Sequence, residues 1–265
     1  MKKYKLTIEY DGTNYSGWQI QKNAKSIQGT LIAAAQSLFG THVEIQGAGR
    51  TDAGVHALGQ VAHLTASGKM HCVKIREGLN DNLPSSVNIT NVKEAPWSFH
   101  ARHDAQARSY IYVLSKSRTA FGKKYVWWVK DKLNVKKMQS SSDIFLNMHD
   151  FASFTDKRID KESSTAVLIH HIRVMESGDL IVLRIVASHF LWKMVRRITG
   201  ILVEVGRGNM NHYDVEHFFA QKSSIPAKFT APPSGLFLEK VFYDGQNWDS
   251  AEFQALPFIL ARLVR

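Results

Sequence analysis

Cysteine is almost absent from this chain of 265 residues, which contains only Cys72. A single cysteine excludes a disulfide within the chain and a cysteine-rich metal site, and it suits a reducing compartment. Long apolar runs are missing as well: no signal-like segment follows Met1-Lys2-Lys3, and no stretch is long enough to span a membrane. We therefore expect a cytoplasmic protein with no membrane partner.

Acidic residues are scarce relative to basic ones, with 23 Asp and Glu against 34 Lys and Arg, a formal net charge of +11. Such a balance indicates polyanionic partners, either nucleic acid or an acidic membrane surface, and says nothing about fold. The hydrophobic fraction of 44% is ordinary for a globular protein, and the length predicts one large domain or two modest ones.

Much of the charge is concentrated in residues 102–137. This segment has ten basic residues against Asp104 and Asp131, so it carries +8 of the +11. Six aromatic residues are interleaved with the cations, and the combination is typical of RNA binding, where cations contact phosphates and rings stack on bases. The alternative is a two-stranded ribbon (107–114 with 125–129) whose lysine edge discourages strand pairing.

A glycine-rich loop, residues 47–57, lies between two strand-like runs, 43–46 and 60–65. Its three glycines within eight residues let the backbone take positive φ and approach a ligand closely. The loop holds one carboxylate, Asp52, two positions from a guanidinium, Arg50. Taken alone, such a loop is most often a tight connection with a solvated ion pair.

Strand and helix patterns mix along the chain, which predicts an α+β fold. We expect two halves, 1–105 with the Asp52 loop and 106–265 with the longest helix. The expected strands are 4–10, 43–46, 60–65, 86–92, the ribbon, a hairpin of 166–175 and 180–187, and 235–243. The expected helices are one from Ser26 to Gly40, 73–79, 135–146, 190–205 and one capped by Asn211 that runs to 220. The polar stretch 155–165 is expected to be a loop.

The string Gly49-Arg50-Thr51-Asp52-Ala53-Gly54-Val55-His56-Ala57 resembles the signature of the tRNA pseudouridine synthase A family. The resemblance covers roughly residues 4–243. Further matching segments are 4–21, 99–112, 149–154, 190–200 and 235–238, in the same order. It implies the pseudouridine synthase fold: two ferredoxin-like α/β halves whose antiparallel-rich mixed sheets are joined around a central basic cleft.

This resemblance also implies an activity, the isomerisation of uridine to pseudouridine without a metal or other cofactor. Asp52 is then the catalytic carboxylate, kept ionised away from water by a cation at the position of Arg196. It attacks C1′ directly or removes the 2′ proton, and the sequence leaves both routes open.

Base contacts follow from the same family match. Tyr110 matches a tyrosine that stacks on the target base and takes the C5 proton, although Tyr112 has the same alternation on an ideal strand. Leu236 matches an apolar residue that packs on the other side of the base. A base in a stem must first be extruded, and Arg50 is expected to fill the gap. We expect His56 to be structural and not a catalytic base.

Family members act on uridines 38, 39 and 40 of the tRNA anticodon arm, and bacterial members are homodimers. Both properties are expected here. Alternatives are the same reaction on ribosomal RNA, a non-catalytic RNA-binding protein, or an enzyme of free nucleotides with phosphate in the glycine loop. Two features depart from the family: His103 replaces an aromatic or apolar residue, and residues 256–265 form an apolar tail.

Overall fold

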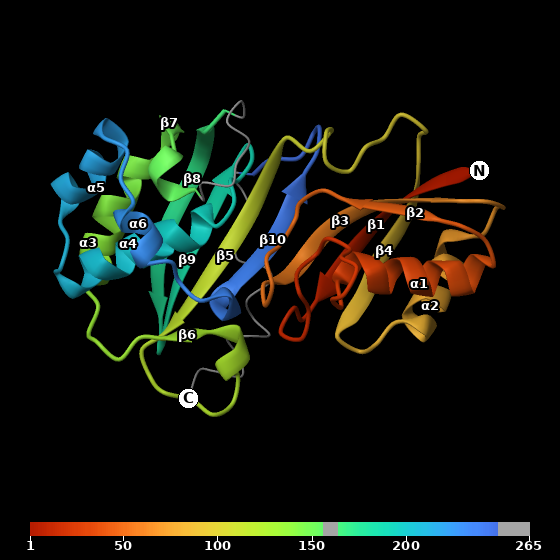
Figure 1. Cartoon of the computed structure of the whole chain (residues 1–265), viewed down its shortest axis with the longest axis horizontal. Helices are drawn as coiled ribbons and strands as arrows, with labels where there is room; N and C mark the ends of the chain where they lie inside the picture. Colours follow the sequence, from red (N-terminus) through yellow and green to blue (C-terminus); the bar gives the residue numbers. More distant parts are fainter. Residues whose placement is uncertain (156–163, 249–265) are drawn as a thin grey trace. The chain divides into compact units, whose positions relative to one another are not determined.

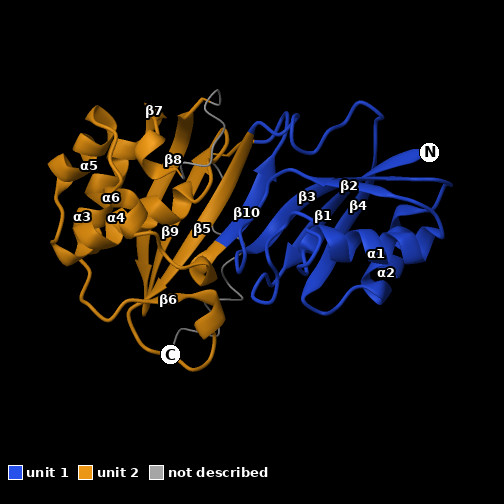
Figure 2. Ribbon diagram, in the orientation of Figure 1, with its two compact units in different colours: residues 1–106, 237–246 blue, residues 107–236, 247–265 orange. Residues whose placement is uncertain are grey.

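The computed structural model describes residues 1–155 and 164–248. These form two compact units, coloured separately in Figure 2. Unit 1 contains Met1–Gln106 and Phe237–Gln246, and unit 2 contains Ala107–Leu236 with Asn247 and Trp248. The chain thus returns to unit 1 at Phe237–Gln246, whereas the expected halves, 1–105 and 106–265, assign this last strand to the second half. Most of the expected loop 155–165 and the tail 256–265 lie outside the described residues.

Unit 1 is built in the order strand, helix, strand, strand, helix, strand (Figure 1). Its elements are β1 (Lys2–Tyr10), α1 (Ile27–Phe39), β2 (Glu44–Gly47), β3 (His56–Ala66), α2 (Cys72–Asn82), β4 (Val87–Ala95) and, late in the chain, β10 (Leu236–Phe242). β1 lies between β4 and β3, antiparallel to both. The far edge of β3 is shared, because β2 pairs antiparallel with residues 62–65 and β10 pairs parallel with residues 56–57.

Alternation on β1 explains the core of unit 1. Tyr4, Leu6, Ile8 and Tyr10 are buried, and the ring of Tyr4 lies 6.5 Å from that of Phe39 in α1, so this face of β1 is covered by the helices. Ser26 caps the start of α1 by accepting from the backbone N–H of Gly29, and Gly40 ends it with φ of 66°. The sequence predicted both ends correctly.

Unit 2 has a four-stranded antiparallel sheet in the order β5-β9-β8-β7, with β6 pairing parallel to β5. The strands are β5 (Ala107–Ser115), β6 (Trp127–Trp128), β7 (Asn147–Asp150), β8 (Ala166–Ser177) and β9 (Leu180–Ala187). The helices are α3 (Val135–Ser142), α4 (Met194–Arg207), α5 (His212–Ala220) and α6 (Ile225–Lys228). Short 3₁₀ turns cover 123–125, 143–145, 152–154 and 233–235. The result is a mixed α+β fold with mostly antiparallel sheets, as expected.

Three expectations for unit 2 need correction. The helix expected from 190 begins at Met194, because Lys193 has φ of 61° and a left-handed residue cannot continue an α-helix. The ribbon is only two residues long on its second strand and is parallel, so β5 pairs antiparallel with β9 and not with 125–129. The helix expected to reach 146 ends at Ser142 and continues as a 3₁₀ turn. The capped helix from Asn211 and the β8–β9 hairpin are confirmed.

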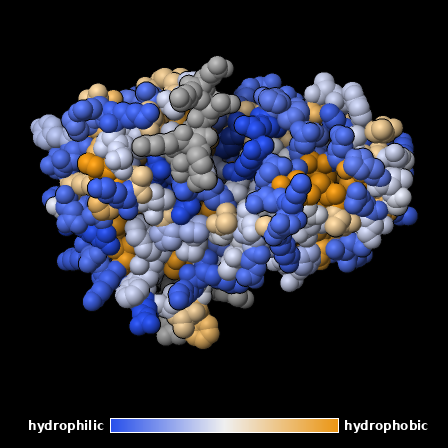
Figure 3. Space-filling model, viewed as in Figure 1, coloured by the Kyte–Doolittle hydropathy of each residue, from blue (hydrophilic) through white to orange (hydrophobic). Residues whose placement is uncertain are grey.

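The surface view agrees with the composition. Hydrophilic residues dominate the face shown in Figure 3, with smaller groups of hydrophobic residues among them. In the described residues, no helix has both the length and the apolar character of a membrane span.

Candidate active site

Backbone hydrogen bonds hold the segment between β2 and β3 at several positions. The carbonyl of Thr51 accepts from the N–H of Trp18 at 3.0 Å, and the N–H of Gly54 donates to the carbonyl of Tyr15 at 3.3 Å. The N–H of Val55 donates to the carbonyl of Asp52 at 3.1 Å, which closes a tight turn around Ala53. Asp52 is half-buried and Arg50 is exposed. The backbone therefore holds Asp52 in place while leaving its side chain partly accessible.

Two glycines before α1 let another part of the chain lie directly against this loop. A Cβ on Gly12 would lie 1.9 Å from the carbonyl oxygen of Val55, and one on Gly17 would lie 2.6 Å from that of Thr51. Gly17 also has φ of 97°, which an L side chain rarely adopts. Residues 12–18 and 51–55 therefore pack directly against each other, although they are separated in sequence.

A buried polar chain supports the loop from the core. Tyr10, 4% exposed, has its hydroxyl 2.8 Å from Oγ1 of Thr51, the residue before Asp52. The side chain of Gln60 hydrogen-bonds Tyr10, and its Nε2 donates to the carbonyl of Gly49 at 2.9 Å. Burial raises the pKa of the Tyr10 phenol, so this group stays protonated near neutral pH. Sequence reasoning did not single out Tyr10, Thr51 or Gln60, and the alternation of β1 predicted only that Tyr10 points inward.

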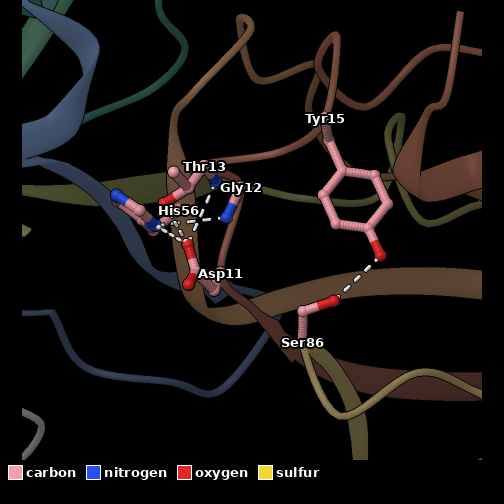
Figure 4. A network of polar contacts seen from close by, with 6 residues as sticks. All are labelled: Asp11, Gly12, Thr13, Tyr15, His56 and Ser86. Atoms are coloured by element: carbon pink, nitrogen blue, oxygen red, sulfur yellow. Dashed lines mark hydrogen bonds and ion pairs between the residues drawn. The ribbon is translucent and has the colours of Figure 1, made fainter. Parts of the chain in front are cut away.

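His56 is buried and contacts the turn that follows β1 (Figure 4). It is 1% exposed, and its ring stacks on that of Phe237 with centroids 4.8 Å apart. Its Nδ1 accepts from the N–H of Gly12 at 3.1 Å and lies 3.2 Å from Oδ1 of Asp11. The same carboxylate oxygen accepts from the N–H and hydroxyl of Thr13. These contacts fasten the turn after β1 to the first residue of β3.

In unit 2, Tyr110 and Tyr112 lie on β5 opposite Ile185 and Leu183 of β9. Tyr110 is 8% exposed, and its ring meets that of Phe190 edge-on at 4.9 Å. Tyr112 is completely buried, and its hydroxyl donates to the carbonyl of Pro232 at 2.7 Å. Burial raises the pKa of Tyr112, an effect that the nearby cation of Arg196 opposes. Tyr112 therefore has a structural hydrogen bond that occupies its hydroxyl.

Arg196 lies in the first turn of α4. Its Nε donates to the carbonyl of Ala231 at 2.7 Å, and its own carbonyl accepts from the N–H of Ala231 at 3.0 Å. Leu236, 6% exposed, is the first residue of β10. It follows Gly235, where a Cβ would lie 2.7 Å from the ring of Tyr112. The segment 231–236 is thus packed against both Arg196 and Tyr112.

The predicted site residues fall into two groups. Asp52 and Arg50 share the loop of unit 1, and Tyr110, Arg196 and Leu236 belong to unit 2. Arg197, beside Arg196 in α4, is 7% exposed and donates to the carbonyl of Thr155. In residues 1–155 and 164–248, no set of three or more His, Cys, Asp or Glu side chains is arranged to hold a metal ion.

Comparison with known proteins covers both units. A family model described as tRNA pseudouridine synthase matches residues 6–104 and 143–244, a range that includes Asp52, Arg196 and Leu236 but not Tyr110. A tRNA pseudouridine synthase A 2 of Bacillus cereus is 37% identical over 244 residues, which are 91% of this chain and 99% of that protein.

Two further comparisons differ in strength. A tRNA pseudouridine synthase A of Ruminiclostridium cellulolyticum is 37% identical over 245 residues, 92% of this chain and 100% of that protein. A chain in the crystal structure of a Cbf5-Nop10-Gar1 complex aligns with 75% of this chain and 54% of its own length, at 11% identity and a TM-score of 0.32, too low to indicate anything by itself.

The matched family model and the two relatives define an RNA-modifying isomerase, an enzyme that converts uridine to pseudouridine in tRNA. The chain belongs to the tRNA pseudouridine synthase family.

Proposed function

We propose that this protein isomerises uridines 38, 39 and 40 in the anticodon stem-loop of tRNA, with Asp52 as the nucleophile. The observation that carries the proposal is the loop of residues 49–57, which has the family's signature string and whose backbone holds Asp52 in a fixed, half-buried position. The relatives named as tRNA pseudouridine synthase A support tRNA as the substrate. A cytoplasmic homodimer completes the proposal.

The proposed reaction needs no change in oxidation state. The carboxylate of Asp52 attacks C1′ of the ribose, and the C1′–N1 bond breaks with its electron pair moving to uracil. Uracil then turns so that C5 attacks C1′ and displaces the carboxylate. The proton leaves C5, N1 takes up a proton, and the product is an isomer of the starting uridine.

Each of the other predicted residues has one role in this scheme. The guanidinium of Arg196 keeps the carboxylate ionised during the reaction. Tyr110 stacks on the base and takes the C5 proton, and Leu236 packs on the opposite face. Arg50, which is exposed, enters the stem where the target base has been extruded. The basic segment 102–137 contacts phosphates of the tRNA.

Asp52→Asn tests the catalytic assignment. The amide keeps the shape of the side chain but is a poor nucleophile, so pseudouridine formation should fall to background while tRNA affinity stays within about twofold. Turnover is measured by the release of tritium from C5 of labelled uridine in tRNA. Appreciable residual turnover would remove Asp52 from the chemistry. Mapping pseudouridine in tRNA and ribosomal RNA from cells without this protein tests the substrate and positions 38–40.

The two tyrosines of β5 provide a matched pair of variants. Tyr110→Phe keeps the ring but loses the proposed base, so kcat should fall by roughly 10²–10⁴ with KM for tRNA unchanged. Tyr112→Phe loses the hydrogen bond to Pro232, so stability should fall by about 1 kcal/mol. The opposite pattern, with kcat lost only in Tyr112→Phe, would assign the catalytic role to Tyr112.

A further inference from the structure

The face of the unit 1 sheet turned away from α1 and α2 has a row of cationic and hydrogen-bonding side chains. Register pairs Lys5 of β1 with Lys93 of β4 on one side and with His63 of β3 on the other. His63 in turn pairs with Gln46 of β2. Paired residues point to the same face, and Tyr4, next to Lys5, packs on α1. Four strands thus contribute a row without a carboxylate.

Two of these residues repel each other. Lys5 and Lys93 lie directly opposite on antiparallel strands, an arrangement that destabilises a sheet when the charges are alike. Burial, and then the charge of Lys93, lower the pKa of Lys5. A polyanion bound over the pair would remove the repulsion, so the row favours an anionic ligand.

The segment that follows β4, residues 96–104, adds an exposed aromatic ring to this face. Nζ of Lys3 donates to the carbonyls of Trp97 and Phe99 at 2.6 and 3.0 Å, and the N–H of Ala101 donates to Nδ1 of His63. The Trp97 side chain remains 62% exposed, with Nζ of Lys3 5.1 Å from its ring centroid.

Lys5 contacts two other rings of this region, and the segment carries further basic side chains. Lys5 Nζ lies 3.6 Å from the ring centroid of Tyr243 and 5.2 Å from that of Phe99. Arg102 and His103 are exposed on the same segment.

Two nearby carboxylates have partners of their own. Oδ2 of Asp104 accepts from the N–H of His100 at 3.0 Å, and Glu94 forms an ion pair of 3.7 Å with Lys2. His63 is neutral near pH 7, because burial lowers its pKa to about 4, so the positive charge comes from lysine and arginine. The exposed ring of Trp97, the exposed Lys93 and Arg102 and the partly buried Lys5 match the chemistry of a nucleic-acid strand: phosphates meet the cations, and a base stacks on the ring.

This surface is separate from the Asp52 loop. Lys5 precedes Tyr10 by five residues on β1, which at roughly 3.3 Å per residue places it about 17 Å away along the strand. Its side chain also points to the face opposite that of Tyr10, which contacts Thr51. Substitutions at Lys5, Lys93 or Trp97 therefore leave the support of Asp52 intact.

We propose that Lys5, Lys93 and Trp97, together with Arg102 and His103 from the start of the basic segment 102–137, form an RNA-binding surface that takes a single-stranded segment of the RNA substrate. The proposal rests on the proposed function in assuming an RNA substrate, but it does not depend on which residue is catalytic. Stacking of unpaired bases on exposed aromatic rings is common in RNA recognition, and Trp97 has that role in this proposal. The surface adds affinity for the substrate and does not take part in the chemistry.

Binding of a fluorescent twelve-nucleotide oligouridine and of a tRNA transcript, followed by anisotropy at several salt concentrations, tests the proposal. Lys5→Gln/Lys93→Gln should weaken oligouridine binding about tenfold and reduce the slope of log K against log salt by about 1.4, or 0.7 for each lost phosphate contact. Trp97→Ala should weaken binding about tenfold without changing the slope, because stacking releases no counterions.

Lys69→Gln/Lys74→Gln is the matched control, because it removes the same charge from exposed lysines before and within α2. It should bind within twofold of the wild-type protein. All variants should keep the wild-type rate at saturating tRNA. The thermal midpoint of Lys5→Gln/Lys93→Gln should stay close to that of the wild-type protein, because relief of the repulsion is offset by loss of the contacts of Lys5 with the rings of Tyr243 and Phe99.

Three outcomes separate the ideas. Unchanged oligouridine affinity in both the Lys5/Lys93 and Trp97 variants would overturn the proposal that this surface binds RNA. A change from dimer to monomer in the same variants, seen by sedimentation, would also overturn it by showing a contact between two copies of the chain. An active Asp52→Asn protein would refute the catalytic assignment alone, since that variant retains the surface and should bind oligouridine normally.

Discussion

Tyr10→Phe removes one buried oxygen atom and should lower the rate of catalysis by disturbing the position of Asp52, beyond its effect on the stability of the fold. Tyr10→Phe deletes the hydroxyl that lies 2.8 Å from Oγ1 of Thr51, the neighbour of Asp52, and that also bonds Gln60. The ring stays, so packing against Trp18, with centroids 6.2 Å apart, is preserved. The variant therefore changes polar support and little else.

The size of the effect follows from burial. Tyr10 is 4% exposed, so water does not readily replace the lost partner of Thr51. A buried polar group left unpaired costs about 1–3 kcal/mol, which for a chain of this size lowers the thermal midpoint by roughly 2–10 °C. Thr51 relieves part of this cost by moving, and a shift of about 1 Å in a catalytic group can reduce the rate about 10²-fold. We expect kcat to fall by roughly 10- to 100-fold.

Tyr4→Phe is the control for stability. Tyr4 lies on the same strand and face, is fully buried, and donates through its hydroxyl to the carbonyl of Met70 at 3.3 Å, away from the loop. Both variants should lose stability, but only Tyr10→Phe should lose kcat, with KM for tRNA within about twofold of the wild-type value. The assay is single-turnover tritium release at saturating tRNA.

Substitutions at Thr51 complete the experiment. Thr51→Ser keeps the hydroxyl and should retain most of the rate, whereas the nearly isosteric Thr51→Val removes it and should resemble Tyr10→Phe. If Tyr10→Phe and Thr51→Val kept the wild-type kcat, the hydroxyl pair would be structural only, and the reasoning that links it to Asp52 would be refuted.

Two further predictions concern the same unit. Gly17→Ala should lower both stability and kcat, because its Cβ would lie 2.6 Å from the carbonyl oxygen of Thr51. The control is Gly68→Ala, which has a similar positive φ of 84° but no atom within 4 Å of the new Cβ, and it should lose only about 1 kcal/mol of stability. Equal losses of stability in urea denaturation would contradict the role of the contact with Thr51. Burial lowers the pKa of His63 to about 4, whereas the pKa in the unfolded chain is 6.5. The neutral His63 therefore contributes its full stability above pH 6.5, and this contribution declines as the pH falls towards 4. Between pH 7 and 5 the free energy of unfolding should fall by about 2 kcal/mol. A His63→Gln protein with the same pH dependence in urea denaturation would show that other groups cause it.

Local patterns predicted the elements whose ends have a side-chain or glycine signal. Helix α1 begins after Ser26 and ends before Gly40 because these residues cap it, and α5 begins after Asn211, whose side chain and that of Asp214 form a capping box. The start of α4 was predicted wrongly because apolar spacing continues back to Phe190. The backbone turn at Lys193, with its positive φ, has no local sequence signal.

The sequence predicted which residues are candidates for the site, but not how their side chains are held. A family signature located Asp52, Arg50, Arg196, Tyr110 and Leu236 as candidates, and their roles remain predictions. Alternation could not separate Tyr110 from Tyr112, because both point the same way from β5. The family match selected Tyr110, and the structure adds that Pro232, far along the chain, accepts the hydrogen bond of Tyr112.

Two segments that resemble the family, residues 4–21 and 49–57, pack together in the structure. Residues 4–21 looked separate from the Asp52 loop in sequence, yet Gly12 and Gly17 are required because the carbonyls of Val55 and Thr51 occupy the space that a Cβ would need. Backbone hydrogen bonds from Trp18 to Thr51 and from Gly54 to Tyr15 join the same two segments. A side chain at either glycine would displace the loop before it altered any catalytic group. The rigidity of Asp52 is therefore encoded largely outside the string that contains it.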